Sequence, residues 1–101
     1  MQMIYCTGNI EIMKEFQNKL EELEVTNYQL YDRVLANNEF GPPRLDNPVW
    51  PGHNFSIFIQ ESNSDKVSAI KNMIKSMNNE ARGANDLVSC YIWSIAEYIV
   101  D

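Results

Sequence analysis

Long apolar runs and basic residues are both scarce in this chain of 101 residues. No stretch approaches the roughly 20 consecutive apolar residues of a membrane-spanning helix, and residues 1–9 lack the basic start and apolar run of a secretory signal. The 8 basic residues are outnumbered by 14 acidic ones, and the net charge of −6 disfavours binding to nucleic acid or to an anionic membrane. We therefore expect a cytoplasmic protein with neither partner.

Signatures of enzymes and of metal centres are also missing. The chain has no glycine-rich phosphate loop, no G-x-S-x-G and no second histidine beside His53, so we predict that it is not an enzyme. It has no H-x-H or C-x-x-C spacing either, and a metal at His53 would need ligands from other copies or from distant carboxylates. The 2 cysteines, Cys6 and Cys90, are too few for a disulfide framework.

Proline and glycine are rare overall but concentrated in one segment. Residues 40–54, FGPPRLDNPVWPGHN, contain all 4 prolines, half of the 4 glycines, one of the 2 tryptophans and the only histidine. Each proline fixes its own φ angle and restricts the residue before it, so the segment loses less entropy on ordering than a glycine-serine loop would. We predict a stiff loop at about residues 36–53.

Four β-prone segments and two amphipathic helices surround this loop. The strands are predicted at residues 2–7, 28–35, 54–60 and 87–93. Residues 54–60 carry apolar side chains on both sides of the pleat, which is typical of a central strand. The tail, residues 94–101, is apolar enough to be packed or paired, as a last helical turn or as a short strand.

The helices are predicted from a shared spacing of apolar residues at i, i+3, i+7 and i+10. The first spans residues 10–24 after Asn9 as its cap, and the second ends within residues 78–83. Ser62 and Asp65 have the spacing of a capping box at the start of the second helix, with Ser64 as a competing cap. The stripes are Met13, Phe16, Leu20 and Leu23 in the first helix and Val67, Ile70, Ile74 and Met77 in the second.

The order of elements predicts one α+β domain over residues 1–101. Two βαβ halves with right-handed crossovers give the ferredoxin-like βαββαβ fold, a four-stranded antiparallel sheet with both helices on one face. The other face would be bare, and a large apolar patch favours self-association.

Cys6 and Cys90 would lie on adjacent strands, with no nearby Lys or Arg evident in the sequence. They could be a redox pair, a soft-metal pair or two small core residues.

Three segments of the chain resemble PII-type signalling proteins, and the resemblance extends over nearly its full length. KLEELEVTNYQLYDRV resembles their passage from the first helix to the second strand. NFSIFIQESNSDKVSAIKNMI resembles their third strand, acidic turn and second helix, and YIWSIAEYI occupies the place of their last strand and the apolar segment that follows it. Proteins of that family are ferredoxin-like trimers that bind small effectors, commonly adenine nucleotides, between subunits. Their loop between strands two and three contacts ligands and partner proteins.

The resemblance implies a homotrimeric regulatory or sensory protein that binds a small molecule or anion in an inter-subunit cleft beside the loop. It names no particular ligand or cofactor. In nucleotide-binding members of the family, a glycine-and-lysine segment after the second helix wraps phosphates, whereas this chain has NNEARGAND, where only Arg82 beside Gly83 matches in kind. The candidate ligand-binding residues are Arg44, Asp46, Trp50 and His53 in the loop, together with Arg82.

Two alternatives remain open at the level of sequence. The divalent-cation tolerance (CutA-type) proteins share the trimeric arrangement and are linked to copper and related metals. A protein like these would use His53, Cys6 or Cys90 with carboxylates to hold a divalent or soft metal. The other alternative is an interaction module without a small ligand, whose loop docks a partner protein.

Overall fold

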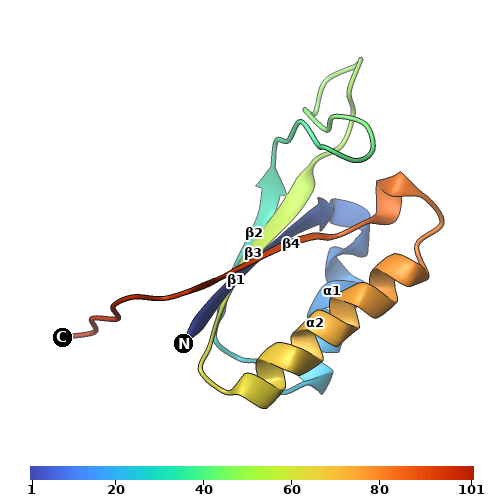
Figure 1. Ribbon diagram of the computed structural model, residues 1–101. Coiled ribbons are helices and arrows are strands. Elements are labelled where there is room, and N and C mark those ends of the chain that lie inside the picture. The colour runs from blue at the N-terminus through green and yellow to red at the C-terminus, as the bar shows by residue number, and fades with distance from the viewer.

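The computed structural model describes all residues from 1 to 101 and contains one four-stranded antiparallel sheet in the order β2-β3-β1-β4. Both long helices cover the same face of this sheet (Figure 1). The predicted ferredoxin-like βαββαβ fold is therefore confirmed. In chain order the elements are β1 (Gln2–Asn9), the 3-10 helix η1 (Ile10–Ile12), α1 (Met13–Glu22), β2 (Tyr28–Val34), β3 (Asn54–Glu61), α2 (Ser64–Asn79), the 3-10 helix η2 (Ala84–Asp86) and β4 (Ser89–Ser94).

The hydrophobic core lies between the helices and the sheet. The predicted apolar stripes supply it: Phe16 and Leu20 of α1 are buried, as are all four stripe residues of α2. Phe16 meets Phe55 of β3 with their ring centroids 5.4 Å apart. The strand β3 is central, as predicted, and Phe55, Ile57 and Ile59 are fully buried. No helix of this fold is both long enough and apolar enough to cross a membrane.

The two helix starts differ in how well the sequence predicted them. Asn9 caps the first helix as expected, because its side chain accepts a hydrogen bond from the amide of Glu11, although the first turn is the 3-10 helix η1. The capping box predicted for α2 is wrong. Its cap is Asn63, whose Oδ1 accepts from the amides of Asp65 at 2.9 Å and Lys66 at 3.1 Å. Asn63 is the residue whose side chain reaches the free first-turn amides.

After Ser94, the last residue of β4, the tail is neither a helical turn nor a strand. One hydrogen bond, from the amide of Ile95 to the carbonyl of Met1 at 3.0 Å, ties the residue that follows β4 to the sheet. The rest extends past the N-terminus of the chain, so no strand lies beside it (Figure 1). Three apolar side chains of the tail are exposed as a result: Tyr98, Ile99 and Val100.

The face of the sheet that carries no helix bears a row of four aromatic rings, one from each strand. Tyr31 of β2 lies 6.1 Å from Phe58 of β3, centroid to centroid. Phe58 lies 4.7 Å from Tyr5 of β1, and Tyr5 lies 6.0 Å from Tyr91 of β4. Tyr31 and Tyr91 are each half exposed, as is the neighbouring Trp93. The predicted bare face is therefore present, and we call these four rings the aromatic row.

Candidate functional site

The loop of residues 36–53 projects from one end of the sheet, between β2 and β3 (Figure 1). It is folded onto itself by backbone hydrogen bonds. Ala36 and Arg44 pair like two strand residues, with N–H to O distances of 2.9 and 2.8 Å. Farther out, the amide of Leu45 donates to the carbonyl of Trp50, and the Oδ1 of Asn47 accepts from the amide of Trp50 at 2.7 Å. The loop thus has a defined shape without regular secondary structure.

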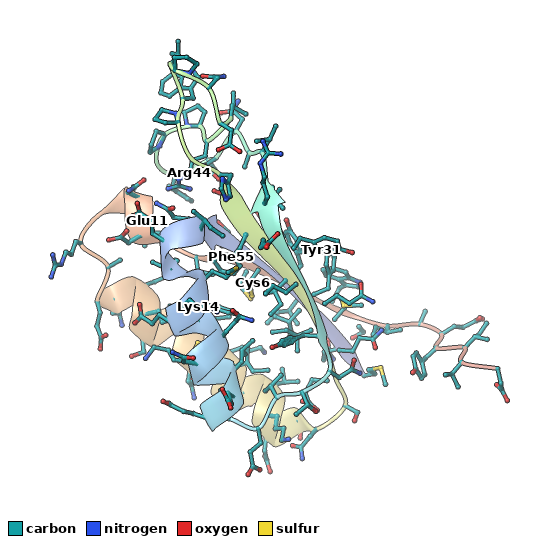
Figure 2. The ribbon with its side chains drawn as sticks, turned by 180° about the vertical axis from the view of Figure 1, so that it is seen from behind. Cys6, Glu11, Lys14, Tyr31, Arg44 and Phe55 are labelled. Carbon is teal, nitrogen blue, oxygen red and sulfur yellow. The ribbon has the colours of Figure 1, made fainter.

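Arg44 fastens this loop to the rest of the domain. Its side chain is buried, and its Nη1 donates to Asn54 Oδ1 at 2.8 Å. Its Nη2 donates to both the carbonyl and the Oδ1 of Asn85 in η2, at 2.9 and 2.8 Å. Burial lowers the pKa of Arg44, and the nearby carboxylates of Asp86 and Glu11 oppose that shift. Figure 2 shows Arg44 and Glu11 at the same end of the sheet. Arg44, one of the candidate ligand-binding residues, therefore also has a structural role as a clamp between the loop, β3 and η2.

Asn54 is the second member of this clamp and was not recognised in the sequence. It is fully buried at the start of β3, and besides accepting from Arg44 it donates through Nδ2 to Asn38 Oδ1 at 2.9 Å and Thr7 Oγ1 at 3.2 Å. Thr7 Oγ1 in turn donates to the carbonyl of Phe55 at 2.8 Å. Every polar atom of the buried amide is thus paired, as buried polar groups require.

A close approach of backbones completes the join between loop and η2. Gly41 has a φ of 84°, a conformation that favours glycine, and a Cβ at this position would lie 3.2 Å from the carbonyl oxygen of Ala84. A side chain here would therefore be strained and would push the loop away from η2.

Asp46 and His53 form a separate cluster on the outer side of the loop. His53 Nδ1 lies 3.0 Å from Asp46 Oδ1, and Arg33 of β2 donates through Nε to Asp46 Oδ2 at 2.8 Å. The hydrogen bond with His53 is the main cause that holds the pKa of Asp46 below its usual range; burial opposes it, and the hydrogen bond from Arg33 assists it. The sequence suggested Asp46 and His53 but gave no sign of Arg33, which comes from another element.

A surface pocket of about 340 Å³ lies between the loop and the two 3-10 helices. Trp50 forms part of its wall and keeps 41 % of its surface exposed. Arg44 lines the pocket from the buried side, and Glu11 contributes a carboxylate. The other lining residues are Asn9, Ile10, Pro42, Pro43, Pro51, Gly52 and Asn85.

Arg82 lies in a neighbouring hollow and not in this pocket. The hollow has a volume of about 330 Å³ and shares Glu11 with the loop pocket. Its other lining residues are Ile12, Glu15, Met77, Glu80, Ala81 and Asp86, so four carboxylates and one arginine line the same hollow. The structure therefore brings Arg44 and Trp50 together but places Arg82 in an acidic setting beside them.

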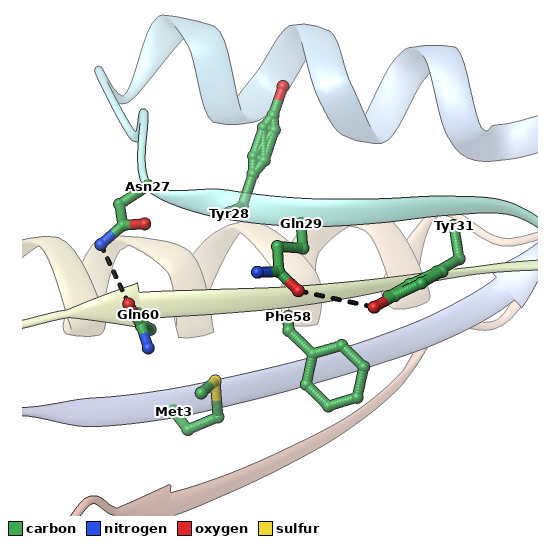
Figure 3. Close-up of a pocket in the computed structure, with 7 residues that line it drawn as sticks. All are labelled: Met3, Asn27, Tyr28, Gln29, Tyr31, Phe58 and Gln60. Atoms are coloured by element: carbon green, nitrogen blue, oxygen red, sulfur yellow. Dashed lines mark hydrogen bonds between the residues drawn. The ribbon is translucent and has the colours of Figure 1, made fainter. Parts of the chain in front are cut away.

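A third hollow, of about 220 Å³, lies on the sheet (Figure 3). Its polar side chains pair with each other: Asn27 Nδ2 donates to Gln60 Oε1 at 3.2 Å, and the hydroxyl of Tyr31 donates to Gln29 Oε1 at 3.4 Å. Phe58 and Met3 supply apolar surface. None of the residues expected from the sequence to bind a ligand lines this hollow, which belongs to the region of the aromatic row.

The two cysteines are direct partners in the pairing of β1 with β4, so the predicted adjacency is confirmed. Both are free thiols, with Cys6 buried and Cys90 partly exposed. The hydrogen bond with Cys90, and then burial, raise the pKa of the Cys6 thiol, whereas the same hydrogen bond lowers the pKa of Cys90. Burial opposes that fall, and the positive charge of Lys71 in α2 assists it. The expectation that no basic residue lies near the thiols is therefore wrong, because the fold brings α2 over β4.

The candidate metal ligands do not form one site. The carbonyl of His53, just before β3, accepts a hydrogen bond from the amide of Ile10 at the end of the sheet. Cys6 pairs instead with Ile57, which lies four residues after His53 in the chain. No group of three or more His, Cys, Asp or Glu side chains in the chain is close enough to hold a metal ion. Within one chain, the candidates form only the pairs Asp46–His53 and Cys6–Cys90.

Comparison with known proteins gives a consistent result at the level of fold. No protein-family model and no curated protein matches the sequence. Among solved structures, a protein of Thermus thermophilus described as PII-like signalling matches with a TM-score of 0.59 at 14% identity, over 91% of this chain and 83% of that one. CPII of Thiomonas intermedia, bound to ADP and bicarbonate, matches with a TM-score of 0.65 at 8% identity, over 95% of this chain and 88% of that one. The chain thus has the fold of the PII-like signalling proteins.

Proposed function

We propose that this chain is a PII-like regulatory or sensory protein that binds a small molecule or anion beside the loop of residues 36–53, in a cleft between the subunits of a homotrimer. The observation that carries this proposal is the clamp from Arg44 to Asn54 and Asn85. It holds an irregular loop in place as one wall of a pocket. Long loops without secondary structure in compact domains are usually functional or disordered, and this one is ordered by buried hydrogen bonds.

The chemistry of the pocket supports a ligand with a flat ring or a compact polar group. The indole of Trp50 offers a face for stacking, and Pro42, Pro43 and Pro51 form walls that lose little entropy on binding. The volume of about 340 Å³ falls at the small end of the range of roughly 300–1,000 Å³ that ligand pockets occupy. Because the Thiomonas protein was solved with ADP and bicarbonate, these two are the first ligands to test.

The candidate residues have different roles within this proposal. Trp50 contacts the ligand directly, while Arg44 positions the loop and lends its charge to the inner wall. Asp46 and His53 hold the outer side of the loop in place. Arg82 lies in the neighbouring hollow. It is the residue of this chain that matches the phosphate-binding segment of nucleotide-binding PII-type proteins. With four carboxylates lining the same hollow and no lysine in residues 78–86, binding of a triphosphate should be weak.

The trimer in this proposal is supported by the aromatic row on the uncovered face of the sheet. Exposed apolar patches of this kind usually mark contacts between proteins. Tyr31, Tyr91 and Trp93 keep between 46% and 54% of their surface exposed in a single chain. Packing this face against two further copies would cover these side chains.

The ligand claim is tested by Trp50 fluorescence in a Trp93→Phe background, which leaves one tryptophan. Titration with ADP or with bicarbonate should change the emission and raise the thermal midpoint, because the ligand binds only the folded state. Trp50→Ala should abolish the thermal shift and Trp50→Phe should retain part of it. An unchanged midpoint with nucleotides and bicarbonate, combined with a shift for Cu, Zn or Ni, would instead favour the metal-binding alternative.

A second candidate function, docking of a partner protein, is favoured by the exposed apolar side chains of the loop. Phe40 and Val49 keep 57% and 73% of their surface exposed. Side chains of this size anchor protein interfaces when they enter a pocket on the partner. If no small molecule or metal shifts the thermal midpoint, then this function replaces the ligand-binding one.

A further inference from the structure

Cys6 and Cys90 occupy a special kind of position in the sheet. The amide of Ile95 donates a hydrogen bond to the carbonyl of Met1. Met1 and Ile95, which adjoin the paired residues Gln2 and Ser94, are therefore a hydrogen-bonded pair of the β1–β4 ladder. In an antiparallel ladder, hydrogen-bonded and non-hydrogen-bonded pairs alternate. The register is unbroken from Gln2 opposite Ser94 to Thr7 opposite Ser89, so Cys6 and Cys90 form a non-hydrogen-bonded pair. These pairs bring the two side chains closest together.

The expected geometry of such a pair suits a disulfide. Directly opposed residues at non-hydrogen-bonded positions have Cα atoms about 4.5 Å apart, and disulfides span Cα separations of about 4.4–6.8 Å. Both cysteines lie on the side of the sheet that faces the helices, since Cys6 belongs to the core and Cys90 packs against it. No large backbone movement is needed to join them.

The surroundings of the two thiols differ in a way that assigns them different roles. Cys90 is partly exposed on the edge strand β4, and the positive charge of Lys71 in α2 favours its thiolate. Cys6 is fully buried, so a reagent from solvent meets Cys90 first. One thiol is therefore placed to react with that reagent, and the other is placed to resolve the product.

We propose that Cys6 and Cys90 are a redox modification site that forms a reversible disulfide between β1 and β4, with a low-molecular-weight disulfide such as oxidised glutathione as the oxidant. The Cys90 thiolate attacks one sulfur of the oxidant, forms a mixed disulfide and releases one thiolate. Cys6 then loses its proton and attacks the Cys90 sulfur, which releases the second thiolate. In total two protein thiols are oxidised and one disulfide is reduced to two thiols.

The first test uses the unaltered protein. The chain is equilibrated with glutathione buffers of increasing oxidised fraction, quenched in acid, alkylated and analysed by mass spectrometry. We expect the loss of two hydrogen atoms per chain, no alkylation, and a tryptic cross-link between residues 1–14 and 83–101. Added reductant should restore both thiols. The proposal is overturned if both cysteines remain open to alkylation in the most oxidising buffer, or if the cross-link joins two chains on a non-reducing gel.

A second test separates the roles of the two thiols. Cys6→Ala should accumulate a stable glutathione adduct on Cys90, because the resolving thiol is gone, whereas Cys90→Ala should leave Cys6 unmodified in the folded protein. Equal reactivity of the two single variants would contradict the assigned order. Lys71→Met should slow formation of the adduct about threefold, and the matched change Lys75→Met, elsewhere on α2, should not. If an alanine variant does not fold, the titration of the unaltered protein still decides the proposal.

Discussion

Arg44 Nη1 lies 2.8 Å from Asn54 Oδ1, and both side chains are buried where the loop meets the sheet. With its bonds to Asn85, the arginine connects the loop, β3 and η2. This arginine is a candidate ligand-binding residue, and these hydrogen bonds also make it a residue that gives the loop its shape.

Removal of this arginine should destabilise the protein strongly. Arg44→Met would leave the buried Oδ1 of Asn54 and two acceptors of Asn85 without their donor, at a cost of about 2–4 kcal/mol in the free energy of unfolding. Urea unfolding measures this cost, and limited proteolysis should show new cleavage within residues 36–53. Arg33→Met is the control, since that side chain is 63% exposed and its ion pair should contribute less than about 1 kcal/mol. Equal losses for the two variants would argue against the clamp.

The cap of α2 provides a smaller and cleaner test. Asn63→Ala removes the acceptor of two first-turn amides and should lower the free energy of unfolding by about 1 kcal/mol. Ser62→Ala and Ser64→Ala should each change it by less than about 0.5 kcal/mol, because neither residue caps the helix. Urea unfolding of the three variants distinguishes Asn63 from the capping box that the sequence suggested.

The fold was predictable because it depends on periodicity. The stripes of α1 and α2 and the alternation in β3 determine which faces are buried, and the order of elements then makes β1 and β4 neighbours. The residue that caps α2 was less predictable. Asn63 and Ser62 are both acceptable caps by composition, and only the path of the chain into α2 decides between them.

The candidate site was predictable in part, for a related reason. The loop and its Trp50 were evident from composition, but the partners that shape the site come from distant parts of the chain. Asn85 lies 41 residues beyond Arg44, and Lys71 approaches Cys90 only because α2 packs over β4. No local pattern encodes such contacts.

Acid should weaken the outer side of the loop through Asp46. Its pKa is held low in the folded protein by His53 and Arg33, so its contribution to stability is present above the unfolded pKa of about 3.9 and is lost as the pH falls through the folded value. The free energy of unfolding of the Asp46→Asn variant should therefore differ from that of the parent at neutral pH and become equal to it in acid. Urea unfolding between about pH 2 and pH 7 measures the difference, with the unpaired Asp32→Asn as a control. A difference that grows in acid would contradict the assignment.

The proposed trimer should depend on the aromatic row. Tyr91→Glu places a charge beside Tyr5 on the uncovered face and should convert the trimer to a monomer, because burying an unpaired charge is costly. Light scattering should then report the 11.7 kDa of one chain, in place of three times that mass. Lys14→Glu, on the exposed side of α1 (Figure 2), is the matched control and should remain trimeric. A parent protein that is already monomeric would remove the inter-subunit cleft.

The pairing of Ala36 with Arg44 bears on how the loop opens. Because Arg44 is also fixed to η2, these two amides cannot be exposed to water by local fraying of the loop alone; the clamp must break as well. In a hydrogen–deuterium exchange experiment the amides of Ala36 and Arg44 should therefore be protected nearly as well as those of the sheet, while their neighbours in residues 37–40 exchange quickly. Ala36 and Arg44, at the base of the loop, would then open only when the core opens, as part of the same cooperative unit.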